Sequence, residues 1–283
     1  MNTMNKILIL YYSGSGSTRL IGEILGKHLL NQYKVDITEI TKNFNYNTIE
    51  DYSLIILGFP SYHCEAPNPV IEFVSNMPAL NKRKKTYVYT TCGIYGGNGI
   101  RNLVKLLITK NLVTINYMVI TGPASDGSLM FPTMMSKLLS RLTYVLRFHV
   151  TTGWKIKKNA ASIDKIMKSL DFQLNIPLYK WYVPLNNIAK YFGENKYNEY
   201  KENIHIIKDR CSNCKICIKN CTSDCWSEGI YNPEFSSEHC EFCLKCIHHC
   251  PEKAIIFSDA MKDKMRLNRK FYKDLARKYF SSD

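Results

Sequence analysis

Apolar residues between positions 5 and 122 follow two alternating patterns. Stretches with helical spacing lie near residues 17–31, 68–76 and 98–110. Between and around them lie five short β-like apolar runs, and consecutive apolar positions such as those of ILIL and LIIL are typical of strands buried on both faces. These runs are KILILYYS, YKVDITEI, SLIILGFP, KTYVYTT and LVTINYMVITGP. Strands joined by helical crossovers predict an open, doubly wound α/β domain with a parallel sheet.

The rest of the chain divides into three further parts. Residues 125–170 end in the amphipathic pattern NAASIDKIMKSL, so we expect them to complete a first domain over residues 1–172. Residues 173–202 are rich in aromatics, which predicts a connector that packs against another part of the protein. A small cysteine-rich domain is expected at 203–260 and a basic tail at 261–283.

The formal net charge of the 283-residue chain is +14, and much of it lies in NKRKK (81–85) and in the tail. We interpret the first run as a solvated face. The tail also carries an apolar stripe at helical spacing, and we expect it to dock an acidic redox partner protein. Binding to nucleic acid is not expected, because no nucleic-acid-binding motif surrounds either run. The residues of the stripe are Met261, Met265, Tyr272, Leu275 and Tyr279.

Two further features concern the environment of the protein. The first apolar run is too short for a signal-peptide core, and no stretch approaches the roughly eighteen apolar residues of a membrane helix. Nine of the eleven cysteines lie between Cys211 and Cys250, which indicates a local chemical site and not a chain-wide disulfide framework. We therefore expect a soluble, cytoplasmic protein with no membrane span and with thiols available to metal.

The turn YYSGSGSTR lies where the first strand gives way to the first helix. Small residues let several backbone N–H groups point at one anion, and the helix N-terminus favours negative charge. Hydroxyls surround this point and no lysine follows, which is typical of a flavin mononucleotide (FMN) phosphate site and not of a Walker loop. The alternative is an ordinary serine-glycine turn. The candidate residues are Ser13, Gly14, Ser15, Gly16, Ser17 and Thr18.

Two later loops favour the flavin interpretation. GFPSYHCEAPNP follows the third strand and TTCGIYGGNG the fourth, so all three loops emerge at the carboxyl edge of the sheet. Tyr62 and Tyr95 are candidates for stacking on an isoalloxazine ring, while Cys64 and Cys92 are expected to be small buried hydrophobes. The other candidate contacts are Pro60, Ser61, Gly93, Gly96, Gly97 and Asn98, together with Cys92.

These loops give residues 5–172 a resemblance to the flavodoxin family. The resemblance implies a five-stranded sheet of order 2-1-3-4-5, with FMN bound where the first and third strands meet. The asparagine usual in the family's phosphate loop is replaced by Ser17 here, which weakens one contact.

The cysteine-rich segment contains two copies of C-x2-C-x2-C-x3-C, at residues 211–221 and 240–250. Three cysteines at this spacing wrap three corners of a [4Fe-4S] cubane, and the fourth reaches the other cluster. A zinc site is the alternative, although zinc ribbons use two CxxC pairs. The segment resembles the small α+β bacterial two-cluster ferredoxins, which implies two ligand sets. One is Cys211, Cys214, Cys217 and Cys250, and the other is Cys240, Cys243, Cys246 and Cys221.

A fifth cysteine, Cys225, leaves two alignments open. If the two motifs are aligned by their cysteine spacing, Cys221 corresponds to Cys250 and TSDC (222–225) is an insertion. If they are aligned by the residues that follow, CWSEGI corresponds to CPEKAI, and Cys225 corresponds to Cys250. We favour Cys221, because a longer excursion must be ordered at an entropic cost. His248 and His249 either tune a cluster by hydrogen bonding or lie on a helix surface.

Together the two parts resemble the flavodoxin–ferredoxin fusion proteins of anaerobic bacteria. The resemblance implies electron transfer between an external redox partner, two [4Fe-4S] clusters and FMN, whose charges would reduce +14 to about +8. One alternative is a flavin-dependent reductase, with SDGSLMFPTMMSKLL (125–139) roofing a substrate pocket. Another is a redox-sensing module that uses Cys225 as a reactive thiol.

Overall fold

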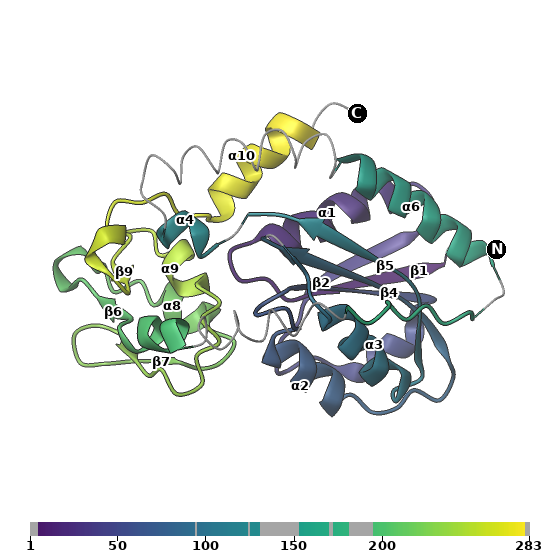
Figure 1. Cartoon of the computed structure of the whole chain (residues 1–283), viewed down its shortest axis with the longest axis horizontal. Helices are drawn as coiled ribbons and strands as arrows, with labels where there is room; N and C mark the ends of the chain where they lie inside the picture. Colours follow the sequence, from purple (N-terminus) through teal and green to yellow (C-terminus); the bar gives the residue numbers. More distant parts are fainter. Residues whose placement is uncertain are drawn as a thin grey trace.

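The computed structural model describes residues 5–93, 95–123, 125–130, 153–169, 172–180 and 195–280. Figure 1 shows an α/β domain with a central sheet and, at one end of it, a smaller body built from the cysteine-rich segment. Helix α10 (Arg269–Phe280) lies over the junction between the two.

The larger domain is built on a five-stranded parallel sheet of order β2-β1-β3-β4-β5. This is the flavodoxin-like strand order, so the predicted fold class is confirmed. Ile9 on the interior strand β1 pairs with Ile37 on one side and Ile56 on the other. The strands are β1 (Lys6–Tyr11), β2 (Lys34–Glu39), β3 (Leu54–Pro60), β4 (Lys84–Cys92) and β5 (Leu112–Thr121).

Alternate residues of the strands are buried in two separate cores. Ile7 and Ile9 pack under the helices on one face, and Leu8 and Leu10 under those on the other. This period of two is the reason why interior strands such as β1 and β3 are apolar at consecutive positions, whereas the edge strand β2 is not. The first face is covered by α1 (Ser17–Leu29) and α6 (Gly153–Lys168), and the second by α2 (Asn68–Asn76) and α3 (Gly99–Ile108). A 3-10 turn, η1 (Tyr46–Asp51), precedes β3, and the short helix α4 (Gly127–Met130) follows β5.

The first part of the expected connector packs onto the sheet domain. The backbone N–H of Asn175 donates to the carbonyl of Thr114 on β5 (2.8 Å), and Arg101 on α3 donates to the carbonyl of Pro177 (2.7 Å). Residues 181–194, and most of the segment expected to roof a substrate pocket, lie outside the described residues. Residues 195–202 are helical and lead into the smaller domain.

The smaller domain consists of short elements around its own core. Strand β6 (His205–Ile206) pairs with β9 (Ile255–Ile256), and β7 (Trp226–Ser227) with β8 (Glu234–Phe235), both antiparallel. Helices α8 (Ile216–Asn220) and α9 (Lys245–His249) carry the cysteine motifs, and 3-10 turns η3 (Lys208–Arg210) and η4 (Asp259–Met261) flank them.

The tail packs inside the protein along its apolar stripe. Leu267 is fully buried and Tyr272 is 5% exposed, and both belong to the sheet-domain core beneath α1. Met265 packs against the same core, while Met261 belongs to the core of the smaller domain. The side chains of Leu275 and Tyr279 lie outside the described residues. Among the helices that are described, none has the length and apolar character needed to cross a membrane.

Candidate functional site

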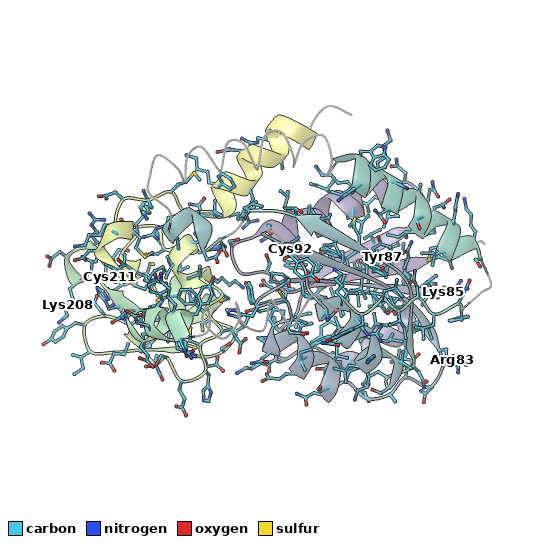
Figure 2. The ribbon with its side chains drawn as sticks, viewed as in Figure 1. Arg83, Lys85, Tyr87, Cys92, Lys208 and Cys211 are labelled. Atoms are coloured by element: carbon cyan, nitrogen blue, oxygen red, sulfur yellow. The ribbon has the colours of Figure 1, made fainter. Side chains whose placement is uncertain are left out.

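A cavity of about 510 Å³ opens at the carboxyl ends of the sheet strands. Its volume lies within the roughly 300–1,000 Å³ range of small-molecule sites. Figure 2 shows Cys92 at the end of β4 that faces the smaller domain, with Arg83 and Lys85 at the opposite end. All three loops expected to meet here line the cavity, through Ser13, Gly14, Ser15, Ser17, Thr18, Pro60, Ser61, Tyr62, Cys64, Cys92, Gly93 and Tyr95. Gly16, Gly96, Gly97 and Asn98, which were also predicted, lie in the same loops but do not line it.

The first loop brings several hydroxyl groups and a helix N-terminus to one wall of the cavity. Gly16 is the N-cap of α1 and has a φ of 128°, a left-handed value that side-chain-bearing residues rarely adopt. Ser17 and Thr18 are buried, and their hydroxyls bond to the Thr91 hydroxyl at 3.3 and 2.7 Å. The wall therefore offers both N–H and O–H donors to an anion.

Another part of the cavity wall was predicted only in part, through the segment 125–139 of the reductase alternative. It is formed by Ser125 and Asp126, which follow β5, by Tyr197, and by Glu241, Phe242 and Leu244 of the smaller domain. The Tyr197 hydroxyl donates to Asp126 Oδ2 (2.6 Å), and burial raises the pKa of this tyrosine. Ser125 and Asp126 begin the segment that the reductase alternative expected over the pocket, and they follow a strand at the same sheet edge. The contribution of the smaller domain has no such signal.

Backbone and side-chain contacts hold the smaller domain against the first loop and the neighbouring strand β2. A Cβ atom added at Gly14 would lie 2.5 Å from the carbonyl oxygen of Cys243, so only glycine permits this approach. His249 Nε2 donates to the carbonyl of Ser15 (3.0 Å), and Lys245 forms an ion pair with Glu39 on β2 (2.5 Å). The cysteine-rich domain thus contacts the loop that was predicted to bind phosphate.

His248 makes a second link between the parts of the chain. Its Nδ1 accepts from the backbone N–H of Leu267 (3.1 Å), so Nε2 carries the proton that is donated to the carbonyl of Ser125 (3.1 Å). Burial lowers the pKa of His248 to about 3, which keeps the imidazole neutral. His248 is fully buried and His249 is half-buried, and both bond to other segments, so the alternative of a simple helix-surface position is contradicted.

Two smaller cavities collect the predicted metal-ligating cysteines. One is lined by Cys211, Cys214, Cys217 and Cys250. The other is lined by Cys240, Cys243, Cys246 and Cys221, together with Cys225. Each cavity therefore receives three cysteines from one motif and the last cysteine from the other, as the resemblance to two-cluster ferredoxins implies.

The backbone of the two motifs repeats with a spacing of 29 residues. Left-handed φ angles occur at Asn213, Lys215 and Asp224 and again at Phe242, Leu244 and Lys253. Cys221 and Cys250 are the C-caps of α8 and α9, with φ angles of −76° and −66°.

The repeat also fixes the structural alignment of the extra cysteine. Each C-cap thiol accepts a backbone N–H from four residues later, Cys225 in one copy and Ala254 in the other, both at 3.3 Å. The segment TSDC thus occupies the place of PEKA, and the expected insertion was wrong. Cys225 is the counterpart of Ala254, and hydrogen bonds with Cys221 and Cys240 raise its pKa.

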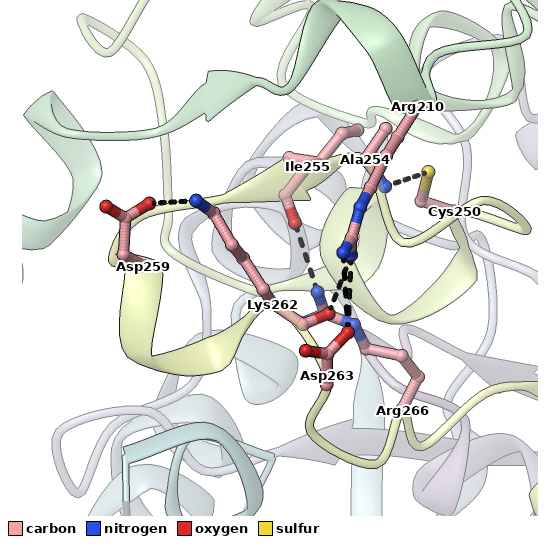
Figure 3. A network of polar contacts seen from close by, with 8 residues as sticks. All are labelled: Arg210, Cys250, Ala254, Ile255, Asp259, Lys262, Asp263 and Arg266. Atoms are coloured by element: carbon pink, nitrogen blue, oxygen red, sulfur yellow. Dashed lines mark hydrogen bonds and ion pairs between the residues drawn. The ribbon is translucent and has the colours of Figure 1, made fainter.

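A buried arginine, Arg266, lies near Ile255 and Cys250, two residues that line the first cysteine cavity (Figure 3). Arg266 is 5% exposed, and its Nη2 donates to the carbonyl of Ile255 (3.4 Å). Within the described part of the chain its Nε and Nη1 atoms have no hydrogen-bond partner. Burial lowers the pKa of Arg266, and the neighbouring Cys250 opposes that shift. The guanidinium is thus a buried cation that lacks a complete set of partners.

The thiols of the cavities are not gathered around single points. In the described ranges, no group of three or more His, Cys, Asp or Glu side chains has the spacing to hold one metal ion. Burial raises the pKa of Cys217 and Cys243 to about 11, so both are protonated thiols at neutral pH. Metal binding at either cavity would displace these protons.

Comparison with known proteins gives similarity to several solved structures and, over a short region, to one protein sequence. An archaeal flavodoxin is 13% identical, covering 58% of this chain and 99% of its own, with a TM-score of 0.42. The flavodoxin of Megasphaera elsdenii is 19% identical, covering 40% of this chain and 85% of its own, with a TM-score of 0.37. Rubredoxin oxygen:oxidoreductase from Desulfovibrio gigas is 16% identical, covering 58% of this chain and 36% of its own, with a TM-score of 0.41.

A further similarity lies in sequence. An uncharacterized polyferredoxin-like protein of Methanocaldococcus jannaschii is 41% identical over 54 residues, which is 19% of this chain. The chain spans 23% of the length of that relative. No family model matches the chain. The strand order places the N-terminal part in the flavodoxin-like fold class, and a short region has a polyferredoxin-like homologue.

Proposed function

We propose that the protein transfers electrons between an external redox partner, two [4Fe-4S] clusters and FMN. The observation that carries this proposal is the shared wall of the large cavity. Glu241, Phe242 and Leu244 lie between or beside cysteines of the second motif and also line the cavity formed by the sheet-edge loops. The proposed cluster and flavin sites therefore adjoin each other within one chain.

The residues of the large cavity fit FMN. The hydroxyls of Ser13, Ser15 and Thr18 and the N-terminus of α1 suit a phosphate group. Tyr62 and Tyr95 offer aromatic faces, and Pro60 and Cys92 add apolar surface for an isoalloxazine ring.

The residues of the two small cavities fit cubane clusters. Each cavity offers four cysteines in the cross-paired arrangement, and the second offers Cys225 in addition. Clusters bound there would carry single electrons, and FMN would carry one or two. The polyferredoxin-like relative supports the same assignment by its name, since ferredoxins bind iron–sulfur clusters.

The protein's own residues hold the two sites at a fixed separation. The ion pair of Lys245 with Glu39 and the hydrogen bond of Asn68 with Glu241 (2.7 Å) both join the domains beside the cavity. Phe242 and Leu244 are buried and exclude water from the boundary. Electron transfer across this boundary then requires no domain movement.

A flavin-dependent reductase is the second candidate, because the cavity wall contains the hydrogen-bonded pair Tyr197 and Asp126. Such a pair can supply a proton to a reduced substrate. Tyr197→Phe should leave reduction of the flavin unchanged in an electron carrier. Loss of turnover with small-molecule acceptors in that variant, at an unchanged rate of flavin reduction, would favour the reductase.

The proposal is tested by changing hydroxyls of the phosphate wall. Ser13→Ala combined with Thr18→Val should release FMN from the anaerobically purified chain while its iron content stays the same. The matched control is Ser53→Ala with Thr48→Val, which removes two exposed hydroxyls away from the cavity. Retention of one FMN per chain in the first double variant would overturn the phosphate-site assignment.

Anaerobic reduction of the full chain tests the rest of the proposal. With a chemical reductant added in steps, the cluster and flavin absorbance bands should both bleach reversibly. A chain that contains zinc and lacks acid-labile sulfide would contradict the cluster assignment.

A further inference from the structure

Ser15 of the first loop is held from two sides by distant parts of the chain. Its carbonyl accepts from His249 (3.0 Å), and its hydroxyl lies 3.1 Å from the hydroxyl of Tyr272, which is 257 residues later in the sequence. Tyr272 belongs to α10, and α10 packs along α1 over the loop (Figure 1). The C-terminal helix therefore contacts the loop that would carry the phosphate of FMN.

The neighbouring glycine makes room for this tyrosine. A Cβ atom added at Gly16 would lie 2.8 Å from the Tyr272 ring. Together with its left-handed backbone, this close approach explains why glycine occupies position 16. The ring therefore lies against the backbone at the N-terminus of α1.

The hydroxyl pair has a defined chemical consequence. Burial raises the pKa of Tyr272, so its hydroxyl stays protonated and can donate to Ser15 Oγ. A serine hydroxyl has one donor and two acceptor positions. When Ser15 accepts from Tyr272, its own hydrogen remains available to a phosphate oxygen, and donors linked in series strengthen one another.

We propose that Tyr272 is a positioning residue for the phosphate group of FMN, which it serves by orienting the Ser15 hydroxyl from the C-terminal helix. The proposal rests on the proposed FMN site. Recognition of the phosphate then depends on correct docking of the tail.

The test compares FMN with riboflavin, which lacks the phosphate group. Each flavin is titrated into the flavin-free full chain with its metal content intact, and binding is followed by flavin fluorescence. Tyr272→Phe keeps the ring and removes only the hydroxyl. We expect this variant to bind FMN about tenfold more weakly, which is the effect of losing about one hydrogen bond. Its affinity for riboflavin should be unchanged. The control Tyr46→Phe, whose hydroxyl donates to the Phe73 carbonyl (3.0 Å), should alter neither affinity.

A double-mutant cycle separates positioning from folding. If Tyr272 acts through Ser15, then Ser15→Ala should weaken FMN binding, and adding Tyr272→Phe should cause little further loss. Additive losses of FMN affinity, or an unchanged preference for FMN over riboflavin in Tyr272→Phe, would overturn only the role of Tyr272 and leave the FMN site standing. A wild-type chain that binds neither flavin, or both equally, would overturn the FMN phosphate site itself and this inference with it.

Discussion

Replacing Gly14 by alanine tests whether the cysteine-rich domain docks on the phosphate loop as described. The added Cβ atom would lie 2.4 Å from Tyr62 Oη and 2.5 Å from the carbonyl oxygen of Cys243. The tyrosine hydroxyl is the end of a side chain and can rotate away, whereas the carbonyl belongs to the backbone of a cysteine motif. Reaching even a tight contact near 3 Å requires a shift of about 0.5 Å, and overpacking of this kind costs about 1–3 kcal/mol.

The expected loss can be measured as the urea concentration that releases flavin from the full, metal-loaded chain. With a denaturant slope of about 2 kcal/mol/M, a loss of about 2 kcal/mol lowers the midpoint by about 1 M. Gly26→Ala is the matched control, because its Cβ would approach the ends of the Ile37 and Ile9 side chains, at 2.8 and 3.5 Å, and neither residue lines the cavity. Adding Tyr62→Phe to Gly14→Ala relieves the hydroxyl contact and should restore little stability. An unchanged midpoint in Gly14→Ala would refute the contact with Cys243.

Further predictions concern the small cavities. The wild-type chain should contain about eight irons and eight sulfides after anaerobic purification, four of each for every cubane. Cys221→Ser should disturb one cluster signal, whereas Cys225→Ala should leave both signals unchanged, because alanine already occupies the equivalent position 254 of the repeat. Both variants are measured by paramagnetic resonance and iron counts. The reverse pattern would show that Cys225 is the ligand. Arg266→Met should lower the reduction potential of the cluster at Cys250, because a buried positive charge favours the more negative reduced state. A redox titration that gives the same potential for both proteins would exclude that effect.

The sheet and its cavity edge were accessible from the sequence because each strand carries its own signal. Strands such as Leu54–Pro60 are apolar at consecutive positions and end in loops that small and aromatic residues mark as unusual. In a parallel sheet these ends must meet at one edge, so the positions of Ser15, Tyr62 and Tyr95 followed from the strand assignment alone.

The wall formed by Phe242 and Leu244 was not accessible in the same way. The cysteine spacing predicts which residues gather around a cluster. It does not predict which surface of the cysteine-rich domain contacts the sheet domain. Both side chains also belong to the core of the smaller domain, so their apolar character is explained before any second role is considered. The TSDC error has a related cause. The cysteine at position 225 favoured a sequence alignment that the backbone angles of Asp224 and Lys253 contradict.

The C-terminal tail illustrates how charge can conceal packing. Its many basic residues favoured an acidic partner, and that hypothesis remains a prediction for the exposed face of α10, where Lys270, Lys273 and Arg277 lie. The other face is buried through Leu267 and Tyr272, which complete the core under α1 and contact the phosphate loop. Deleting the whole tail would therefore damage the flavin site whether or not a partner binds. Only charge changes confined to the exposed face can separate partner docking from the role of the helix in closing the loop.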